Sequence, residues 1–397
     1  MFQFFRSITF FFFLIYSVNA FSTSCEDRII HIPGYAQLVS ENAKINEKTV
    51  RDFALIQSSQ NCYLEVWPTS TEAVSRLVKI AYQSNISIRT QGSAHSQNGS
   101  SLPNELELLI HTQHLNFVRF THKNTLIAGA GIPLFSLQQF LLVHHYGSLP
   151  VVNGGGMGPT IGGYISAGGI SPTSELYGGF WENVRQITLV TDSGKILHIN
   201  SDSNLFPWVF GSMGQLGIIT EVTLDLMSSS NTYPLGLAAT ISVDSSEDYR
   251  LPIYWFNLFV NSHQKNDAIF DINQLKEKYQ NFFVYPNAYI WKIKFKKFMP
   301  PLLYSENNDF DVVGFFGYPK QSNIDVKTLM SLENDFSNLV QQKHYRRYIQ
   351  AELSRGPLVY QKYFGNNLYQ QFGKIKIQLD PKFLFNKNSV FLTTEQS

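Results

Sequence analysis

The pattern of apolar and polar positions in the first half of the chain predicts helices that alternate with strands. Residues 69–84 form a clear helical pattern, and Thr69 and Glu72 have the spacing of a capping box at its start. Its apolar positions recur every three or four residues: Val74, Leu77, Val78 and Ala81. Short apolar runs predict strands at 86–89, 106–113 and 125–134, and a further helix is expected before Gly147.

Alternating apolar and polar residues predict strands farther along the chain. Residues 183–200 contain two such segments around a tight turn at 192–194. Residues 218–226 alternate, and one apolar face collects Ile218, Val222, Leu224 and Leu226. From about Met227 glycines become rarer and aromatic runs appear, so we expect a second domain there that covers the substrate.

The first 20 residues have the features of a secretory signal peptide. Arg6 precedes an apolar run that continues to Val18, and residues 18–20 form a small-residue cleavage site. A membrane anchor is the alternative, but the run is short for a bilayer, so we expect no stable membrane span. The prediction is cleavage after Ala20 and a secreted or periplasmic protein.

Cysteine content and charge narrow the function classes. Cys25 and Cys62 are the two cysteines, and an oxidising compartment favours a disulfide between them, with two free thiols as the alternative. Two cysteines cannot make a thiolate zinc site, and His111 and His114 lack a carboxylate partner, so we expect no metal. A net charge of +1 gives no basis for nucleic-acid binding.

Two glycine-rich segments carry the strongest chemical signal. They are 91–99, with the sequence QGSAHSQNG, and 149–172, and both lie near predicted strands. Glycines let the backbone approach a ligand closely, and concave backbone amides bind anions such as pyrophosphate. The chain has no GxxxxGK[ST] loop, no dinucleotide fingerprint in its required context and no GxSxG nucleophile elbow. The residues alone therefore predict a dinucleotide-like ligand.

Seven motifs, taken in order, resemble those of a known family. They are EVWPTSTEAVSRLVKIA, IRTQGSAHSQNG, LIAGAGIPLFSLQQFL, PTIGGYISAGGIS, ENVRQITLVTDSGKIL, FGSMGQLGIITEVTL and LDPKFLFN. The chain resembles the FAD-linked oxidoreductases of the vanillyl-alcohol oxidase and p-cresol methylhydroxylase (PCMH) type, and within them the cytokinin dehydrogenase-like branch.

The resemblance implies an α+β fold, in which a two-part PCMH-type FAD-binding domain carries an inserted α+β cap domain for the substrate. The corresponding division is a signal peptide at 1–20, the FAD-binding domain at 21–227, the cap at 228–345 and a C-terminal return to the FAD-binding domain at 346–397.

The resemblance also assigns residues that bind FAD. The pyrophosphate loop corresponds to Gly92, Ser93, Ala94, His95 and Ser96, and family loops usually carry glycine at the Ala94 position. The positions near the flavin are Thr160, Gly162, Gly163, Ser166, Gly168 and Ile170. Gly217 and Ile219 match the segment at the adenine end, and Asn388 lies where the C-terminal tail closes over the cofactor. In many members the histidine is bonded to the 8α-methyl carbon of the flavin, so FAD is either covalent through His95 or hydrogen-bonded near it.

Two positions depart from the family pattern. The aspartate that accepts the substrate's proton in cytokinin dehydrogenases corresponds to Gly155, so this base is missing. The cysteine of members with doubly attached flavin corresponds to Gly158, which excludes a second bond. The remaining candidates for a catalytic base come from the region that returns to the flavin: Glu352, His344 and Tyr348.

The sequence thus predicts an exported FAD-dependent oxidoreductase, either an oxidase or a dehydrogenase. Its small-molecule substrate would give hydride from a C–H bond next to an alcohol or amine to flavin N5, and molecular oxygen or another electron acceptor would reoxidise the flavin. The alternative is an FAD-binding protein that has lost turnover and serves as a surface or host-interaction module, because the family base is missing and the cap is short.

Overall fold

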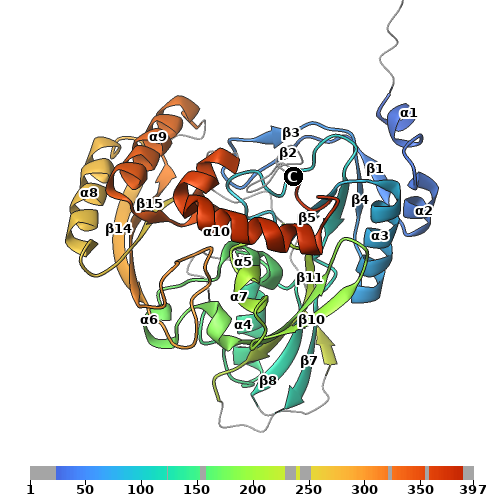
Figure 1. Cartoon of the computed structure of the whole chain (residues 1–397), viewed down its shortest axis with the longest axis horizontal. Helices are drawn as coiled ribbons and strands as arrows, with labels where there is room; N and C mark the ends of the chain where they lie inside the picture. Colours follow the sequence, from blue (N-terminus) through green and yellow to red (C-terminus); the bar gives the residue numbers. More distant parts are fainter. Residues whose placement is uncertain are drawn as a thin grey trace, which may run out of the picture.

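The computed structural model describes residues 24–122, 124–152, 158–228, 238–241, 252–320, 324–353 and 357–387. Within these ranges the chain forms three larger sheets and a two-stranded one, with helices packed beside them (Figure 1). This mixture of helices and sheets confirms the predicted α+β class. The predicted signal peptide, residues 1–20, lies outside the described residues.

The first sheet, with the strand order β1-β4-β6-β5, positions the QGSAHSQNG loop at the end of β5. Its strands are β1 (Lys44–Asn46), β4 (Tyr63–Val66), β5 (Ile88–Gln91) and β6 (Leu108–His111). β6 pairs in parallel with both β4 and β5. Helix α3 (Thr71–Ser84) joins β4 to β5 and buries the apolar stripe that the sequence predicts.

Two local expectations in this sheet are wrong. Ser70, and not Thr69, caps α3, because Ser70 has the extended backbone of an N-cap residue and accepts a hydrogen bond from the N–H of Ala73. His111 does have a carboxylate partner, since its Nε2 lies 3.3 Å from Oε2 of Glu65 on the neighbouring strand. The sequence does not reveal this contact, because His111 and Glu65 are 46 positions apart and meet only through the pairing of their strands. Within the described ranges, no group of three or more His, Cys, Asp or Glu side chains could hold a metal ion.

The second sheet is antiparallel throughout and has the order β10-β9-β11-β8-β7-β12. Its strands are β7 (Phe117–His122), β8 (Thr125–Gly129), β9 (Val184–Val190), β10 (Ile196–Asn200), β11 (Ile218–Asp225) and β12 (Ala238–Thr240). The turn between β9 and β10 is where the sequence predicts it, closed by a hydrogen bond from the N–H of Gly194 to the carbonyl of Thr191.

Short helices occupy the connections of this second sheet. They are α4 (Leu134–Val143), α5 (Ile161–Ala167), α6 (Ser174–Tyr177), η1 (Phe180–Asn183) and α7 (Phe206–Val209). A single apolar core joins several of them to the sheet, and fully buried aromatic residues such as Trp181 and Phe206 lie within it. Apolar residues of the second glycine-rich segment are part of this core, which holds the segment in place.

The third sheet has the order β14-β15-β13-β16 and is also antiparallel. Its strands are β13 (Tyr254–Val260), β14 (Phe283–Ile293), β15 (Phe310–Pro319) and β16 (Arg346–Arg347). Helices α8 (Lys265–Lys278) and α9 (Val326–Lys343) cover one face of it (Figure 1). That face buries Tyr254, Phe256 and Leu258, which alternate with residues of the opposite face.

The C-terminal part of the described chain returns to the first sheet. It contains η3 (Ile349–Ala351) and the long helix α10 (Pro357–Leu379), whose helical geometry is interrupted at Gly365 (Figure 1). Beyond α10 the backbone lies beside β5, where the N–H of Ile88 donates to the carbonyl of Leu384 at 2.8 Å. The N–H of Asn386 donates in turn to the carbonyl of Ile88 at 2.9 Å.

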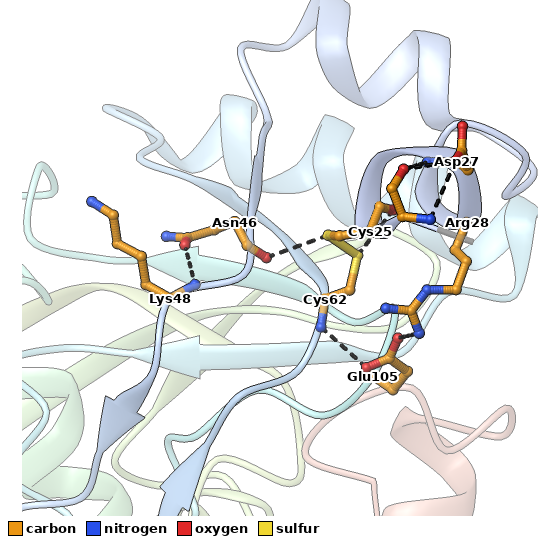
Figure 2. The surroundings of a disulfide bond; sticks show 8 residues. Cys25, Asp27, Arg28, Asn46, Lys48, Cys62 and Glu105 are labelled. Atoms are coloured by element: carbon orange, nitrogen blue, oxygen red, sulfur yellow. Dashed lines mark hydrogen bonds and ion pairs between the residues drawn. A yellow bond between two sulfur atoms is a disulfide. The ribbon is translucent and has the colours of Figure 1, made fainter. Parts of the chain in front are cut away.

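A disulfide ties the N-terminal arm to the first sheet. Cys25 and Cys62 are bonded, with 5.4 Å between their Cα atoms, so α1 (Cys25–Ile29) is held at the start of β4 (Figure 2). The arm continues through α2 (Tyr35–Ser40) and through β2 (Val50–Arg51), which pairs with β3 (Ser58–Ser59). In the part of the chain that the structure describes, no helix is long and apolar enough to cross a membrane.

Candidate cofactor and substrate site

A cavity of about 620 Å³ lies between the two glycine-rich segments and the third sheet. Its size is in the range of small-molecule and cofactor sites. The structure brings most of the predicted cofactor residues to its wall: Gly92, Ser93, Ala94, His95, Ser96, Thr160, Gly162, Gly163, Ser166, Ile170, Gly217 and Ile219. Segments far apart in sequence therefore meet at one site, as a large ligand requires.

Gly92 to Ser96 form a tight loop with unused backbone donors. Ala94 has a left-handed backbone (φ 51°), which turns the chain sharply between its neighbours. The N–H groups of Gly92, Ala94 and Ser96 donate to no group of the described residues. A Cβ atom at Gly92 would lie 2.3 Å from Oγ1 of Thr160, so only glycine allows this loop to approach the second segment so closely.

Hydrogen bonds hold the residues after this loop in place. The hydroxyl of Ser96 bonds to Oδ1 of Asn98 and to the hydroxyl of Ser100, each at 2.7 Å. The N–H of Ser100 also donates to Oδ1 of Asn98. Side-chain amides extend the network, since Gln91 donates to the carbonyl of Ser101 at 3.2 Å and Gln97 to the carbonyl of Ile253. The loop is therefore a fixed part of the cavity wall.

His95 points its ring into an aromatic stack. The ring lies parallel to that of Phe53, with 4.0 Å between centroids and an angle of 19° between planes. The ring centroid of Trp255, on strand β13 of the third sheet, lies 6.3 Å from that of His95. Because stacking restricts rotation of the imidazole, its orientation within the cavity is defined before any ligand binds.

The second glycine-rich segment opens α5 and reaches the cavity through its first turn. Thr160 is the N-cap of α5 and accepts a hydrogen bond from the N–H of Gly163. Gly168 does not line the cavity, and a Cβ atom there would instead meet Leu303 at 2.4 Å. Gly155 and Asn388 lie outside the described residues, so their predicted roles are not placed.

The third sheet provides an aromatic roof over these loops. One of its faces presents Trp255 from β13, Tyr289 and Trp291 from β14, and Phe316 and Tyr318 from β15 to the cavity. Tyr289 lies against Trp291 edge-on, with 5.3 Å between ring centroids. Asn257 on β13 is the polar residue of this face, and it is 4% exposed.

The three candidate bases have different positions. Tyr348 lines the cavity, whereas His344 is an exposed residue at the end of α9. Glu352 is fully buried away from the cavity, where its Oε2 lies 2.8 Å from Nη1 of Arg347. The same Arg347 donates to both carboxylate oxygens of Glu333, so its guanidinium is paired with both buried carboxylates. Of the three, only Tyr348 faces the site.

No Asp, Glu, Lys or Arg is found among the described residues that line the cavity. Its titratable side chains are His95 and four tyrosines: Tyr164, Tyr289, Tyr318 and Tyr348. Burial raises the pKa of Tyr164, Tyr289 and Tyr348 well above the usual value. These phenols therefore stay protonated near neutrality and act as hydrogen-bonding groups.

Several wall residues were not predicted. Asn386 enters the cavity from the C-terminal segment, two positions before the expected Asn388, and its Nδ2 donates to the carbonyl of Met213 at 2.8 Å. Met213 and Gly214 lie in the motif FGSMGQLG, and the glycines of this motif could have indicated that it lies close to the cofactor. The roof residues of the third sheet carried no sequence signal beyond their aromatic character.

The described residues fit FAD at this site. The free N–H groups of the Gly92 loop are suited to an anionic pyrophosphate. Two buried oxygens on the wall, Oγ of Ser101 and Oδ1 of Asn386, have no hydrogen-bond partner and are available to a polar ligand. Fold and cavity thus define a protein that binds a large, partly anionic cofactor.

Comparisons with known proteins identify the cofactor and the family of the domain that binds it. Residues 64–200 match the family model of the FAD binding domain. Cytokinin dehydrogenase 5 of Arabidopsis thaliana is 28% identical over 185 residues, which cover 44% of this chain and 34% of that protein. D-lactate dehydrogenase of Archaeoglobus fulgidus is 26% identical over 41% of this chain and 38% of that protein. L-gulonolactone oxidase of Bos taurus is 26% identical over 51% of this chain and 46% of that protein.

The match over residues 64–200 shows an FAD binding domain in this chain, and its cofactor is FAD. The proteins to which the chain is similar are named as dehydrogenases and an oxidase. The similarity of the chain to the cytokinin dehydrogenases is modest, since other oxidoreductases match equally large parts of it. The matched regions span between about a third and a half of the length of these relatives.

Proposed function

We propose that this protein is an exported FAD-dependent oxidoreductase that acts on a small molecule bearing a C–H bond next to an alcohol or amine. Bound FAD supplies a hydride acceptor at flavin N5. The observation that supports the proposal is the cavity itself, in which glycine loops with unused N–H donors face an aromatic roof. The glycine loops suit the cofactor, and the aromatic roof suits an organic substrate.

The glycine loops hold the cofactor in this proposal. Gly92 to Ser96 receive the pyrophosphate on their backbone N–H groups, and Thr160 to Ile170 lie along the flavin. Gly217 and Ile219 line the adenine end. Asn386 closes the wall beside Met213, which places a polar side chain where the C-terminal segment meets the cofactor.

The aromatic roof and the buried tyrosines act on the substrate. Trp255, Tyr289 and Trp291 exclude water from the space above the flavin, which strengthens polar contacts inside it. The raised pKa of Tyr348 makes it a hydrogen-bonding group that orients the substrate rather than an ionised base. Molecular oxygen or another electron acceptor regenerates the oxidised protein.

We further propose that His95 is the point of covalent attachment of FAD. Its ring is half-buried, lines the cavity and is oriented by Phe53. Acid precipitation tests this link, because a covalent flavin stays with the polypeptide and its fluorescence is found in the pellet. Mass spectrometry of the tryptic peptide 90–119 should then show the added mass of the flavin on His95. Flavin found wholly in the supernatant would contradict the attachment while leaving FAD binding intact.

Export is part of the same proposal. The disulfide between Cys25 and Cys62 is consistent with an oxidising compartment, and the first 20 residues have the composition of a signal peptide. A secreted or periplasmic location is tested by fractionation of cells that express the full chain. Mature protein that starts after Ala20 is the expected product.

The decisive experiment is anaerobic reduction of the purified yellow protein by a panel of alcohols, amines and lactones. Bleaching of the flavin by at least one of them, followed by recovery of the colour with an electron acceptor, is expected. An FAD-binding protein without turnover is not favoured, because the curated relatives are named as oxidoreductases. It would gain support if dithionite bleached the flavin but no member of the panel did.

A further inference from the structure

The roof of the cavity contains one polar bridge that crosses three strands. In the register of the third sheet, Asn257 on β13 and Tyr289 on β14 both lie opposite Gly314 of the middle strand, β15. The hydroxyl of Tyr289 donates to Oδ1 of Asn257 across that glycine. A Cβ atom at position 314 would lie 2.6 Å from Oδ1 of Asn257, so glycine leaves the gap that the bridge needs.

This bridge fixes which atom of the Asn257 amide faces the ligand. Because Oδ1 accepts the Tyr289 hydroxyl, the Nδ2 group is the remaining end of the amide, and it donates to no described residue. Asn257 as a whole residue is nevertheless only 4% exposed, and it lines the cavity. An amide donor on a nearly buried residue that lines a cavity is best satisfied by an acceptor atom of a ligand in that cavity.

A second unused donor lies on the same roof. The indole Nε1 of Trp291 is buried and has no hydrogen-bond partner, and Trp291 packs edge-on against Tyr289. Around these two N–H groups the roof is aromatic, with Trp255 and Phe316 directly opposite each other on neighbouring strands. The roof thus offers hydrogen-bond donors for an oxygen atom within flat apolar surfaces.

Charge limits the ligand further. The cavity wall in the described residues has no Lys or Arg that could neutralise an anion, and no Asp or Glu that could neutralise a cation. Burying an unpaired carboxylate or ammonium among aromatic rings is strongly unfavourable. A neutral oxygen acceptor, such as a hydroxyl, amide or lactone carbonyl, satisfies both N–H donors without that penalty.

We propose that Asn257, held by Tyr289 across Gly314, together with Trp291, makes this site specific for a neutral molecule with a flat or ring-shaped body and an oxygen acceptor, and that it rejects carboxylates. The inference rests on the proposed function for the position of the substrate. It assigns Asn257 as the residue that determines specificity and Tyr289 as the residue that positions its amide.

Benzamide and benzoate test this inference, because they have nearly the same size and shape and differ in charge. Binding to the FAD-loaded protein is followed by quenching of tryptophan fluorescence, to which the two roof tryptophans contribute. Benzamide should bind at least ~10-fold more tightly than benzoate. Asn257→Asp should lower the affinity for benzamide by ~10-fold, as expected for the loss of one hydrogen-bond donor in the cavity. Tyr289→Phe should weaken it by a smaller factor, because the amide remains but is no longer oriented.

Asn266→Asp is the matched control, because it makes the same change at an exposed position on α8, one of the helices that cover the third sheet. It should leave both affinities unchanged. If Asn257→Asp does not fold, as judged by its FAD content, Tyr289→Phe carries the test. The inference is overturned if benzoate binds as tightly as benzamide, if neither probe binds, or if both roof variants behave like the control. Because binding is measured without turnover, a failure here is distinct from a failure of the substrate panel.

Discussion

Arg89 and Glu107 form a buried ion pair that joins the C-terminal segment of the described chain to the cofactor loop. Nε and Nη2 of Arg89 each donate to a carboxylate oxygen of Glu107 at 3.1 Å, and both side chains are 2% exposed. The same guanidinium donates to the carbonyl of Ser100 at 3.0 Å and to that of Lys387 at 3.3 Å. The pair therefore links β5, the cavity wall and the C-terminal segment.

Replacing Arg89 by methionine should lower the free energy of unfolding by about 3–5 kcal/mol, because the Glu107 carboxylate would stay buried without its cationic partner and keep only the hydrogen bonds from Asn104. Urea denaturation of the purified protein measures this loss. The double variant Arg89→Met/Glu107→Leu removes both charges and should recover much of the stability. A loss no larger than that of an exposed pair, about 1 kcal/mol or less, would show that water reaches Glu107.

Gly92→Ala should impair FAD binding, because the new Cβ would lie 2.3 Å from Oγ1 of Thr160 and force the loop away from α5. Overpacking of this kind costs about 1–3 kcal/mol, which corresponds to a roughly 5- to 150-fold weaker cofactor affinity if it acts on the bound loop. The ratio of FAD to protein after dialysis measures the effect. Removing the obstructing hydroxyl in Gly92→Ala/Thr160→Ala should restore part of the binding, and no restoration would place the defect elsewhere.

Loss of the disulfide should destabilise the protein as a whole. The bond closes a segment of 37 residues, and the chain-entropy model gives about 4 kcal/mol for a loop of that length. Cys25→Ser/Cys62→Ser should therefore unfold at a clearly lower urea concentration than the wild type. Treatment of the wild type with a reducing agent should produce the same shift, whereas the double variant should not respond to it.

Acid should remove a stabilising contribution of Glu65. Burial opposes ionisation of this carboxyl, but hydrogen bonds from His111 and Asn46 lower its pKa below the ordinary value of 4.5. A carboxylate with a lowered pKa stabilises the fold above its unfolded pKa, and the contribution is lost as pH falls through the folded value. Glu65→Gln should thus be less stable than the wild type by about 1 kcal/mol near neutrality, and the gap should close well below pH 4.5. A gap that does not change with pH would exclude ionisation as its source.

The local elements of the first half were predictable because their signals are local. The stripe of α3, the turn between β9 and β10 and the face of β11 each depend on residues a few positions apart. The cap of α3 was misplaced by one residue, since Thr69 and Ser70 are both good cap residues and only the backbone decides between them. The partner of His111 was missed because it lies across a parallel sheet.

The roof of the site was not predictable, and the reason is physical. β13 is buried on both faces, so Tyr254 and Phe256 pack against helices while Trp255 and Asn257 face the cavity. An apolar run of this kind has no alternation from which the two faces could be told apart. Tyr289 and Gly314 acquire their roles only through strand register.

The return of the C-terminal segment to β5 has a consequence for the order of events in the cell. Gly92 is made early, but Asn386, which completes the same wall, is made after every other residue that lines the cavity. Until Asn386 has been made, the cavity therefore lacks one of its wall residues. We expect stable flavin binding to require this segment, so a product truncated before α10 should have the glycine loops but bind FAD more weakly than the full chain.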